Sequence, residues 1–471
     1  MYTTITTGFF FIESVTKGEK MSMNKLLSVF LGSVLMVSLW GRYAAASDDM
    51  NLCIFDPHPE SENISLPEDD GFHYPNQWRG DPKKVNWNEP WGALESMWKT
   101  WSWEAYPKNC RDHKRGDHKR GDHKRGDHKR GDHKRGDHKY CEPVKLEGFI
   151  MFAAAHIQSP FENGKLGWVR VLVSGFLGPD GVYRNHLYFA PGQFPPNSNG
   201  QDLFIGGPDE TAVLEVMDDG SMVPVEDPSL LIGEVVGSGG SESVSYFTND
   251  GSIAMQVQDE SIKRPSYPFT DGYNPLWKYY WSRPMMASQG DVVFDDVAYH
   301  VVGTAWAERE WNFNVPDLAG LYQERHANIQ IMGCLDKKGN KISCEHSLRT
   351  ILAFDIRFKD DHSNAIHDWE EIGPPPSCAH HKLTEPSDWR ITPLEYFVSE
   401  RTGIKYARKV RLTAPSRGVD LVIEATVDEQ EVYKVFGLFP AWYEGSATLS
   451  GTIDGKRVWG NAFLESFNYM P

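Results

Sequence analysis

The sequence lacks several patterns that would name a function directly. Its 471 residues contain no C-x-x-C pair, so a zinc knuckle or a thioredoxin-type redox site is not supported. The Gly/Ser segment 237–241 has neither a phosphate-loop Lys-Ser/Thr nor the G-x-S-x-G of a nucleophile elbow, and we interpret it as a flexible turn. Positive charge is scarce, with 48 Lys and Arg against 65 Asp and Glu, a net charge of −17. This balance argues against nucleic acid or an anionic membrane surface as a general partner.

Long hydrophobic runs are also scarce, and the one that is present lies near the start. Lys25 precedes the apolar stretch 26–40, and the small residues Ala44 to Ala46 follow it. This order is typical of a secretory signal, so we assign residues 1–46 to a leader and signal peptide cleaved after Ala46. The stretch is short of the roughly 20 residues of a membrane span, although an uncleaved signal that acts as an anchor is the alternative. We expect an exported, periplasmic or secreted protein with no stable membrane span after cleavage.

Six cysteines fit an exported protein, because disulfides persist in oxidising compartments. Two pairs are plausible from their local setting, one bracketing a repetitive insert and one flanking a turn-like segment. The third pair follows by elimination. The predicted disulfides are Cys110–Cys141, Cys334–Cys344 and Cys53–Cys378.

The insert at 111–139 repeats the pentapeptide Asp-His-Lys-Arg-Gly and has no apolar residue with which to form a core. We interpret it as a solvated loop expanded by repeat slippage. Its regularly spaced histidines leave a metal or polyanion tract as the alternative. Neighbouring Lys and Arg side chains repel a divalent cation, which favours the loop.

The remaining sequence indicates an all-β protein with few short helices. Short β-branched segments alternate with turn clusters such as Asp454-Gly455, a pattern typical of barrels or sandwiches. Segment 91–103 is rich in tryptophan and forms either a short helix or the first strand of the first barrel. A break near Pro316 places the domain boundary around residue 314, which gives domains 47–313 and 314–471. The segments expected to form strands are 168–173, 211–216, 348–358, 419–425 and 447–453.

Segment 299–311 carries two carboxylates, a guanidinium and two indoles, and its alternation predicts a strand. With a period of two, Trp306, Glu308 and Glu310 share one face, while Arg309 and Trp311 share the other. Gly303 suits a close approach of a neighbouring backbone.

The motifs around this strand carry a resemblance to a known family. The stretch 280–284, the pattern G-x-A-W-x-E-x-E-W at 303–311 and C-terminal motifs including Trp442-Tyr443-Glu444-Gly445 and Phe463-Leu464-Glu465 are in the order and spacing of that family. The chain resembles the AttH proteins, the carotenoid 1,2-hydratases (hydroxyneurosporene synthases) and the kievitone hydratases, most closely over residues 270–471. The carotenoid hydratases carry a His before the last Trp where this chain has Arg309 or Glu310, and their aspartate is matched to Asp336.

The resemblance implies two tandem lipocalin-like antiparallel β-barrels and a hydro-lyase or cyclase that acts on an apolar isoprenoid or polyketide-like substrate. Hydrating an alkene needs an acid that can protonate carbon, surroundings that tolerate a cation, and one positioned water. A buried carboxylic acid near a second carboxylate meets the first need, because both effects raise its pKa. No metal or organic cofactor is required. The predicted catalytic residues are Glu308, Glu310, Trp311 and Asp336, and the predicted substrate-binding residues are Tyr280, Trp281, Trp306, Arg309, Trp442 and Glu444.

Structural readings of the same residues stay open. If Glu308 and Glu310 face water, Arg309 pairs across strands and Trp311 lines the cavity. Glu444 and Glu465 are then hydrogen-bonded structural groups, and the protein is a non-catalytic carrier or envelope protein that binds a small hydrophobic ligand. A metal site is a weaker alternative, formed by Cys378, His380 and His381 with His362 and His367.

Overall fold

The computed structural model describes residues 91–108, 142–192, 203–238, 240–263, 266–269, 279–313, 321–358, 364–374, 378–383, 388–433 and 441–468. The predicted signal peptide and the repeat insert lie outside these residues. Strands dominate the described ranges, whose one helical element is the short 3₁₀ helix η5 (Pro415–Arg417). None of their helices is long and apolar enough to cross a membrane. The expected all-β, lipocalin-like fold with few short helices is confirmed.

The first sheet contains 13 of the described strands, all paired antiparallel. Its path runs β5-β8-β9-β10-β12-β13-β1-β2-β3-β4-β6-β7, and β11 pairs with β12. The sheet curls far enough for Arg170 of β3 to donate to the backbone oxygen of Phe204 in the edge strand β5 at 3.4 Å. The strands are β1 (Trp91–Pro107), β2 (Val144–Gln158), β3 (Leu166–Leu177), β4 (Tyr183–Pro191), β5 (Leu203–Gly206), β6 (Leu214–Val216), β7 (Met222–Pro224), β8 (Leu231–Ser238), β9 (Ser241–Phe247), β10 (Ile253–Ser261), β11 (Ser266–Phe269), β12 (Tyr279–Phe294) and β13 (Val297–Phe313).

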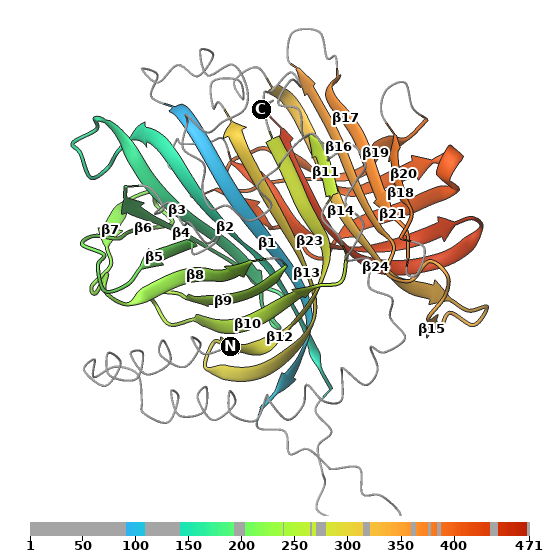
Figure 1. Ribbon diagram of the computed structural model, residues 1–471, viewed down its shortest axis with the longest axis horizontal. Coiled ribbons are helices and arrows are strands. Elements are labelled where there is room, and N and C mark those ends of the chain that lie inside the picture. The colour runs from blue at the N-terminus through green and yellow to red at the C-terminus, as the bar shows by residue number, and fades with distance from the viewer. Residues whose placement is uncertain are drawn as a thin grey trace, which may run out of the picture.

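The second sheet contains 11 of the described strands in the order β18-β17-β16-β14-β24-β23-β21-β20-β19, with β15 paired to β14 and β22 to β23. Figure 1 shows the two sheets side by side, the first mainly in blue to yellow and the second in orange and red. The strands are β14 (Leu321–Leu335), β15 (Lys341–Ile342), β16 (Thr350–Phe358), β17 (Asn364–Ile372), β18 (His380–Leu383), β19 (Arg390–Val398), β20 (Lys405–Ala414), β21 (Val419–Ala425), β22 (Glu431–Val432), β23 (Trp442–Ile453) and β24 (Lys456–Asn468).

Three buried clusters follow from the alternation of side chains along these strands. One fills the concave side of the first sheet and includes Trp101 and Val301. Another fills the concave side of the second sheet and includes Ile329. The third contains residues of both sheets, among them Trp306 and Trp442, and therefore forms an apolar layer between them. We call this third cluster the inter-sheet layer.

Strand β13 contributes one face to the inside of the first sheet and the other to the inter-sheet layer. Ala305 and Ala307 belong to the inner cluster, whereas Trp306 belongs to the inter-sheet layer. Gly303 allows the backbone of β1 to approach, since a Cβ at this position would lie 2.1 Å from the Ser102 backbone oxygen. Segment 91–103 lies within β1, so of its two expected conformations the structure has the strand.

Two further contacts fix the C-terminal half. Cys334 and Cys344 form the expected disulfide across the turn after β14, with Cα atoms 5.7 Å apart. Cys378 is disulfide-bonded too, but the predicted pairs Cys53–Cys378 and Cys110–Cys141 include residues outside the described ones. Lys263, after β10, is 1% exposed and donates from Nζ to the backbone oxygens of Ile372 (2.9 Å) and Gly373 (2.7 Å). It thereby joins the first sheet to the end of β17.

Candidate functional site between the two sheets

Glu308 lies in the inter-sheet region, where it meets polar side chains from the second sheet. It is 4% exposed, and its Oε1 accepts a hydrogen bond from Nδ2 of Asn328 on β14. Nε2 of His326, also on β14, lies 3.8 Å from the same oxygen, and the opposite ring nitrogen Nδ1 lies 3.1 Å from Oε2 of Glu465 on β24. His326 therefore stands between two carboxyl groups, one from each sheet.

Burial is the main reason why Glu308 keeps its proton more readily than an ordinary carboxyl. Burial raises the pKa of Glu308 to about 7, and the neighbouring Glu465 and Glu310 add to the effect. His326 and a hydrogen bond with Tyr280 act in the opposite direction without cancelling it. Near neutral pH a substantial fraction of Glu308 is a carboxylic acid that can donate a proton.

Glu444 on β23 enlarges the acidic group. It pairs with Glu465 across β23 and β24 and accepts a hydrogen bond from the indole Nε1 of Trp442 at 3.2 Å. Burial, followed by the charges of Glu465 and Glu308, holds the pKa of Glu444 well above its usual range. We call Glu308, His326, Glu444 and Glu465 the inter-sheet acid cluster.

Aromatic rings surround the inter-sheet acid cluster. The His326 ring stacks on Phe354 with centroids 3.9 Å apart, and Tyr280 meets Phe354 edge-on at 5.1 Å. Trp442 stacks on Phe467 at 5.7 Å. Burial and the nearby Glu308 hold the pKa of the Tyr280 hydroxyl well above its usual value, so Tyr280 stays neutral. The cluster thus combines acids with ring faces that can stabilise a positive charge.

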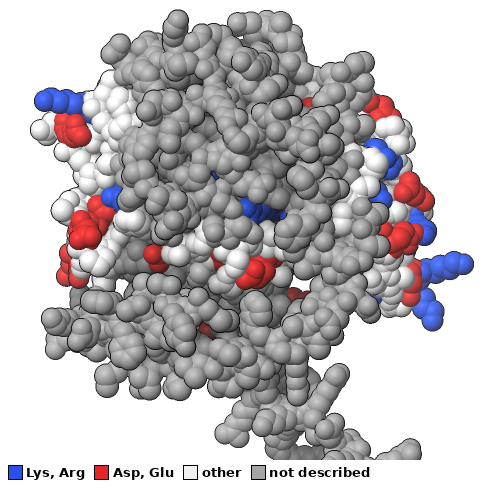
Figure 2. Space-filling model, viewed as in Figure 1, with Lys and Arg blue, Asp and Glu red and all other residues white. Residues whose placement is uncertain are grey.

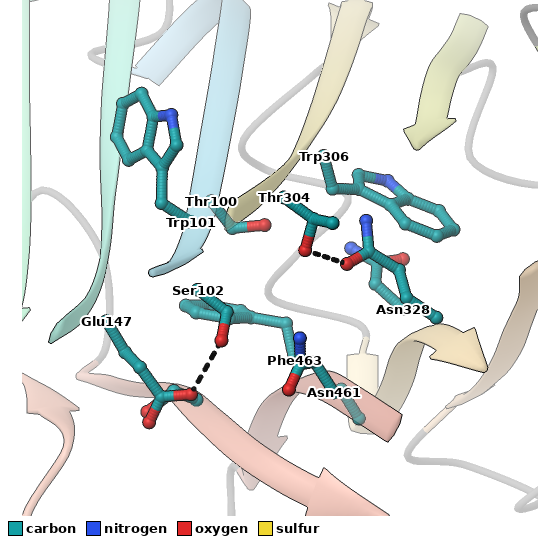
Figure 3. Close-up of a pocket in the computed structure, with 12 residues that line it drawn as sticks. Thr100, Trp101, Ser102, Glu147, Thr304, Trp306, Asn328, Asn461 and Phe463 are labelled. Carbon is teal, nitrogen blue, oxygen red and sulfur yellow. Dashed lines mark hydrogen bonds between the residues drawn. The ribbon is translucent and has the colours of Figure 1, made fainter. Parts of the chain in front are cut away.

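A small cavity adjoins Asn328 between the sheets. Its volume is about 20 Å³, and its lining includes Thr304 and Trp306 from the first sheet and Asn328 and Asn461 from the second. Figure 3 shows these side chains together, with the Thr304 hydroxyl bonded to Oε1 of Gln330 at 2.6 Å and Ser102 bonded to Glu147 at 3.2 Å. The cavity therefore lies on the same side of β13 as Glu308 and is lined by both polar and apolar side chains.

Five of the predicted site residues converge here, namely Tyr280, Trp306, Glu308, Trp442 and Glu444. Glu310 follows Glu308 on the same face and is half-buried, opposite Tyr280 in the β12–β13 pairing. The backbones of Trp281 and Trp311 lie in β12 and β13, but their side chains lie outside the described part of the structure.

Arg309 and Asp336 lie elsewhere. Arg309 is 1% exposed and points to the opposite side of β13, where its charge helps to lower the pKa of Glu242. It cannot contact a substrate beside Glu308, because a strand sends neighbouring side chains to opposite faces. Asp336 belongs to the exposed turn after β14, where its Oδ1 accepts from the amides of Lys338 and Asn340, both at 2.8 Å. The structure brings neither residue to the inter-sheet acid cluster.

Sequence reasoning missed His326 and Asn328 and gave Glu465 a structural role. A signal was present, because His326, Asn328 and Gln330 alternate with the apolar Ala327, Ile329 and Ile331. Such alternation predicts a strand with a polar face, but it does not say that this face meets Glu308. For the alternative metal site, no group of three or more His, Cys, Asp or Glu within the described ranges could hold a metal ion. His362 lies outside those ranges.

The described part of the face in Figure 2 shows acidic and basic side chains interspersed, without a broad basic patch. This distribution agrees with the net charge of −17 in giving a nucleic acid little to bind. The expectation that nucleic acid is not a partner stays a prediction.

Comparisons with known proteins place the fold. No family model matches the sequence, and no curated protein matches it. Among solved structures, a protein assigned as AttH from Nitrosomonas europaea is similar with a TM-score of 0.55 and 16% identity, over 88% of this chain and 100% of that one. Kievitone hydratase from Nectria haematococca is similar with a TM-score of 0.48 and 11% identity, over 80% of this chain and 89% of that one. At the level of the fold, the resemblance to AttH proteins that the sequence motifs predict is confirmed.

Proposed function

We propose that this chain is an exported hydratase (hydro-lyase) or cyclase in which Glu308 protonates an alkene of an apolar isoprenoid or polyketide-like substrate. The observation that carries the proposal is a 4% exposed carboxyl with a pKa raised to about 7, next to a histidine that contacts a second carboxyl. Strongly perturbed acids of this kind are typical of catalytic sites. The Cys334–Cys344 disulfide supports the exported location.

The first step transfers the proton of Glu308 to one alkene carbon, which leaves a carbocation at the other and a carboxylate on Glu308. A general acid is most effective when its pKa lies near the working pH, and a value of about 7 meets this condition. The rings of Tyr280, Phe354 and Trp442 can stabilise the cation by up to about 2 kcal/mol each when water is excluded.

The second step adds water to the cation. The carboxylate of Glu465 accepts the proton that the attacking water loses and passes it to Nδ1 of His326 at 3.1 Å. Nε2 of His326, at 3.8 Å, returns a proton to Glu308. Both carboxyl groups are restored, and the net result is one alkene and one water converted into one alcohol. His326 ends with its proton on Nδ1 instead of Nε2, and a proton exchange with solvent returns the original tautomer before the next turnover. Within a cyclase, a second double bond of the substrate would replace water as the nucleophile.

The experiment that tests this function is the substitution Glu308→Gln, assayed with kievitone and with linear isoprenoid alkenes. We expect turnover to fall by about 10²- to 10⁴-fold, because glutamine has the shape of the acid but no proton to give. The matched control is Glu395→Gln, which changes a carboxyl that is 50% exposed on β19. A substrate whose turnover survives E308Q removes Glu308 from catalysis.

The alternative is a non-catalytic carrier. The observation that favours a carrier is the inter-sheet layer, because it supplies apolar surface for a hydrophobic ligand. A carrier binds its ligand without changing it, and E308Q should then alter affinity only modestly. Mass spectrometry of lipid that copurifies with the exported protein distinguishes the two. A hydrated or cyclised ligand supports the enzyme, whereas an unmodified ligand that stays unmodified on incubation supports the carrier.

A further inference from the structure

We propose that the 20 Å³ cavity beside Asn328 holds the water molecule that adds to the substrate, and that Trp306 and Asn328 position it. This inference rests on the proposed function, because it assigns the second reactant of the same site. It adds a role for Trp306 that differs from that of an aromatic wall.

Two of the residues that line the cavity each carry a buried polar atom that has no partner in the described structure. These are the indole Nε1 of Trp306 and the Oδ1 of Asn328, on side chains from residues 2% and 5% exposed. A buried polar group without a partner costs about 1–3 kcal/mol, so both atoms favour a molecule that can accept from one and donate to the other. Water does both.

The size of the cavity selects the ligand. A buried water needs roughly 10–15 Å³ of cavity volume measured with a water-sized probe, and this cavity provides about 20 Å³. One water fits, whereas an isoprenoid does not. The substrate must therefore reach the cation-forming position from another side of the inter-sheet acid cluster.

Gln330 does not compete for this water, because its amide is already engaged. Its Oε1 accepts from Thr304 at 2.6 Å, and its Nε2 donates to the backbone oxygens of Pro284 and Ala305, both at 3.1 Å. These bonds fix Gln330 across the two sheets and leave the Trp306 and Asn328 atoms to orient the water.

Asn328 also connects the cavity to the acid. Its Nδ2 donates to Oε1 of Glu308, so one end of its amide is bound to the acid, and the other end, Oδ1, has no partner in the described structure. When Glu308 has given its proton to the alkene, the water oxygen forms a bond to the cation and its proton leaves to Glu465. If no water is positioned, the cation loses a proton from carbon instead and yields an isomerised alkene.

A crystal structure of the intact protein at high resolution tests the site without any substrate. We expect one ordered water within hydrogen-bond distance of Trp306 Nε1 and Asn328 Oδ1, and its loss in Trp306→Phe. A dry cavity in the unchanged protein, or side chains that turn both atoms away from it, overturns the proposal whatever E308Q shows.

A second experiment separates positioning from a structural role, using kievitone and linear isoprenoid alkenes in D₂O. W306F should keep Glu308-dependent deuterium incorporation into the alkene while the ratio of hydrated to isomerised product falls about tenfold, since one hydrogen bond to water is lost. The matched control is Trp459→Phe, which removes a second buried indole Nε1 without a partner, outside the lining of this cavity. Parallel loss of exchange and hydration in W306F, or an unchanged ratio, contradicts the assignment. Turnover in E308Q reports on the proposed function separately.

Discussion

The two faces of the β1–β13 pair bury acids equally well and treat them in opposite ways. On the inner face, Glu242 is fully buried, and burial alone would raise its pKa, yet Lys99 and then Arg283 outweigh it and lower the pKa. On the outer face, burial raises the pKa of Glu308 to about 7, because His326 and Tyr280 lower it without cancelling the effect of burial. Burial therefore raises the pKa of a carboxyl unless cations close to it outweigh the effect, as Lys99 and Arg283 do for Glu242.

Lys99 is the centre of the inner-face network. Its Nζ lies 2.6 Å from both Glu242 Oε2 and Asp259 Oδ2, and Trp101 donates from Nε1 to Asp259 at 3.1 Å. Burial would lower the pKa of Lys99, but Asp259 and Glu242 raise it above its usual value. The inner face is built of compensated charges, whereas the outer face keeps an excess of acid.

The largest effect should come from removing that compensation. Lys99→Met leaves Glu242 and Asp259 buried without their cation, and we expect the free energy of unfolding to fall by about 3–5 kcal/mol. Urea denaturation at pH 7 measures the change. The double variant K99M/D259N is the control, and it should recover much of the loss because it removes one charge of each sign while Glu242 keeps Arg283 beside it. A fall of less than about 1 kcal/mol for K99M would show that Lys99 does not compensate the buried charges of Glu242 and Asp259.

Glu308→Gln tests the outer face through the pH dependence of stability. The folded-state pKa of Glu308 lies above the usual 4.5, so the folded protein binds this proton more tightly than the unfolded chain does. The resulting stability is present below about pH 4.5 and is lost as the pH rises through about 7. A shift of this size corresponds to about 3 kcal/mol.

We therefore expect the stability of E308Q, relative to the unchanged protein, to increase between pH 5 and pH 8. Denaturation midpoints at both pH values measure it, with Glu395→Gln as the control that should follow the unchanged protein. A difference that stays constant with pH would mean that Glu308 titrates as an ordinary carboxyl.

The smallest effect should come from Asp336→Asn. The carboxylate accepts hydrogen bonds within its own turn, chiefly from Asn340, and these lower its pKa. A carboxyl whose pKa is depressed in the folded state stabilises the fold at pH values above its unfolded-state pKa. This stabilisation is lost as the pH falls through the folded-state pKa, so D336N should lower the melting temperature slightly at neutral pH. Turnover should stay within about twofold. A large loss of activity would return Asp336 to the site.

The sequence predicted the local part of this structure well and the part that depends on contact between the sheets poorly. Alternation from Trp306 to Glu310 identified a strand with two unlike faces, and the turn at Asp454-Gly455 is present, with φ values of 50° and 75°. These are local properties that a period of two or a turn residue determines. Segment 211–216 was expected to be a strand throughout, but only Leu214–Val216 is.

The site itself depends on which strands of the second sheet pack against β13. His326 and Asn328 contact Glu308 because β14 packs against β13 at this point. The packing of two distant strands cannot be predicted from the sequence pattern of either one. Asp336 shows the same limit, because a residue of a plausible type that directly follows β14 lies in an exposed turn. Family resemblance supplied the tandem fold, but residue roles needed the packing of the two sheets.

Lys263 donates two hydrogen bonds to main-chain oxygens of the second half, those of Ile372 and Gly373. Backbone oxygens are present whatever the side chain, so replacing Ile372 by another residue that keeps β17 in place leaves both hydrogen bonds available. These two hydrogen bonds therefore depend on the side chain of Lys263 and not on the side chain of Ile372. Substitutions in β17 that keep its backbone in place therefore preserve this contact. Lys263 itself can be replaced with similar length and charge only by arginine, whose planar guanidinium has a different donor geometry.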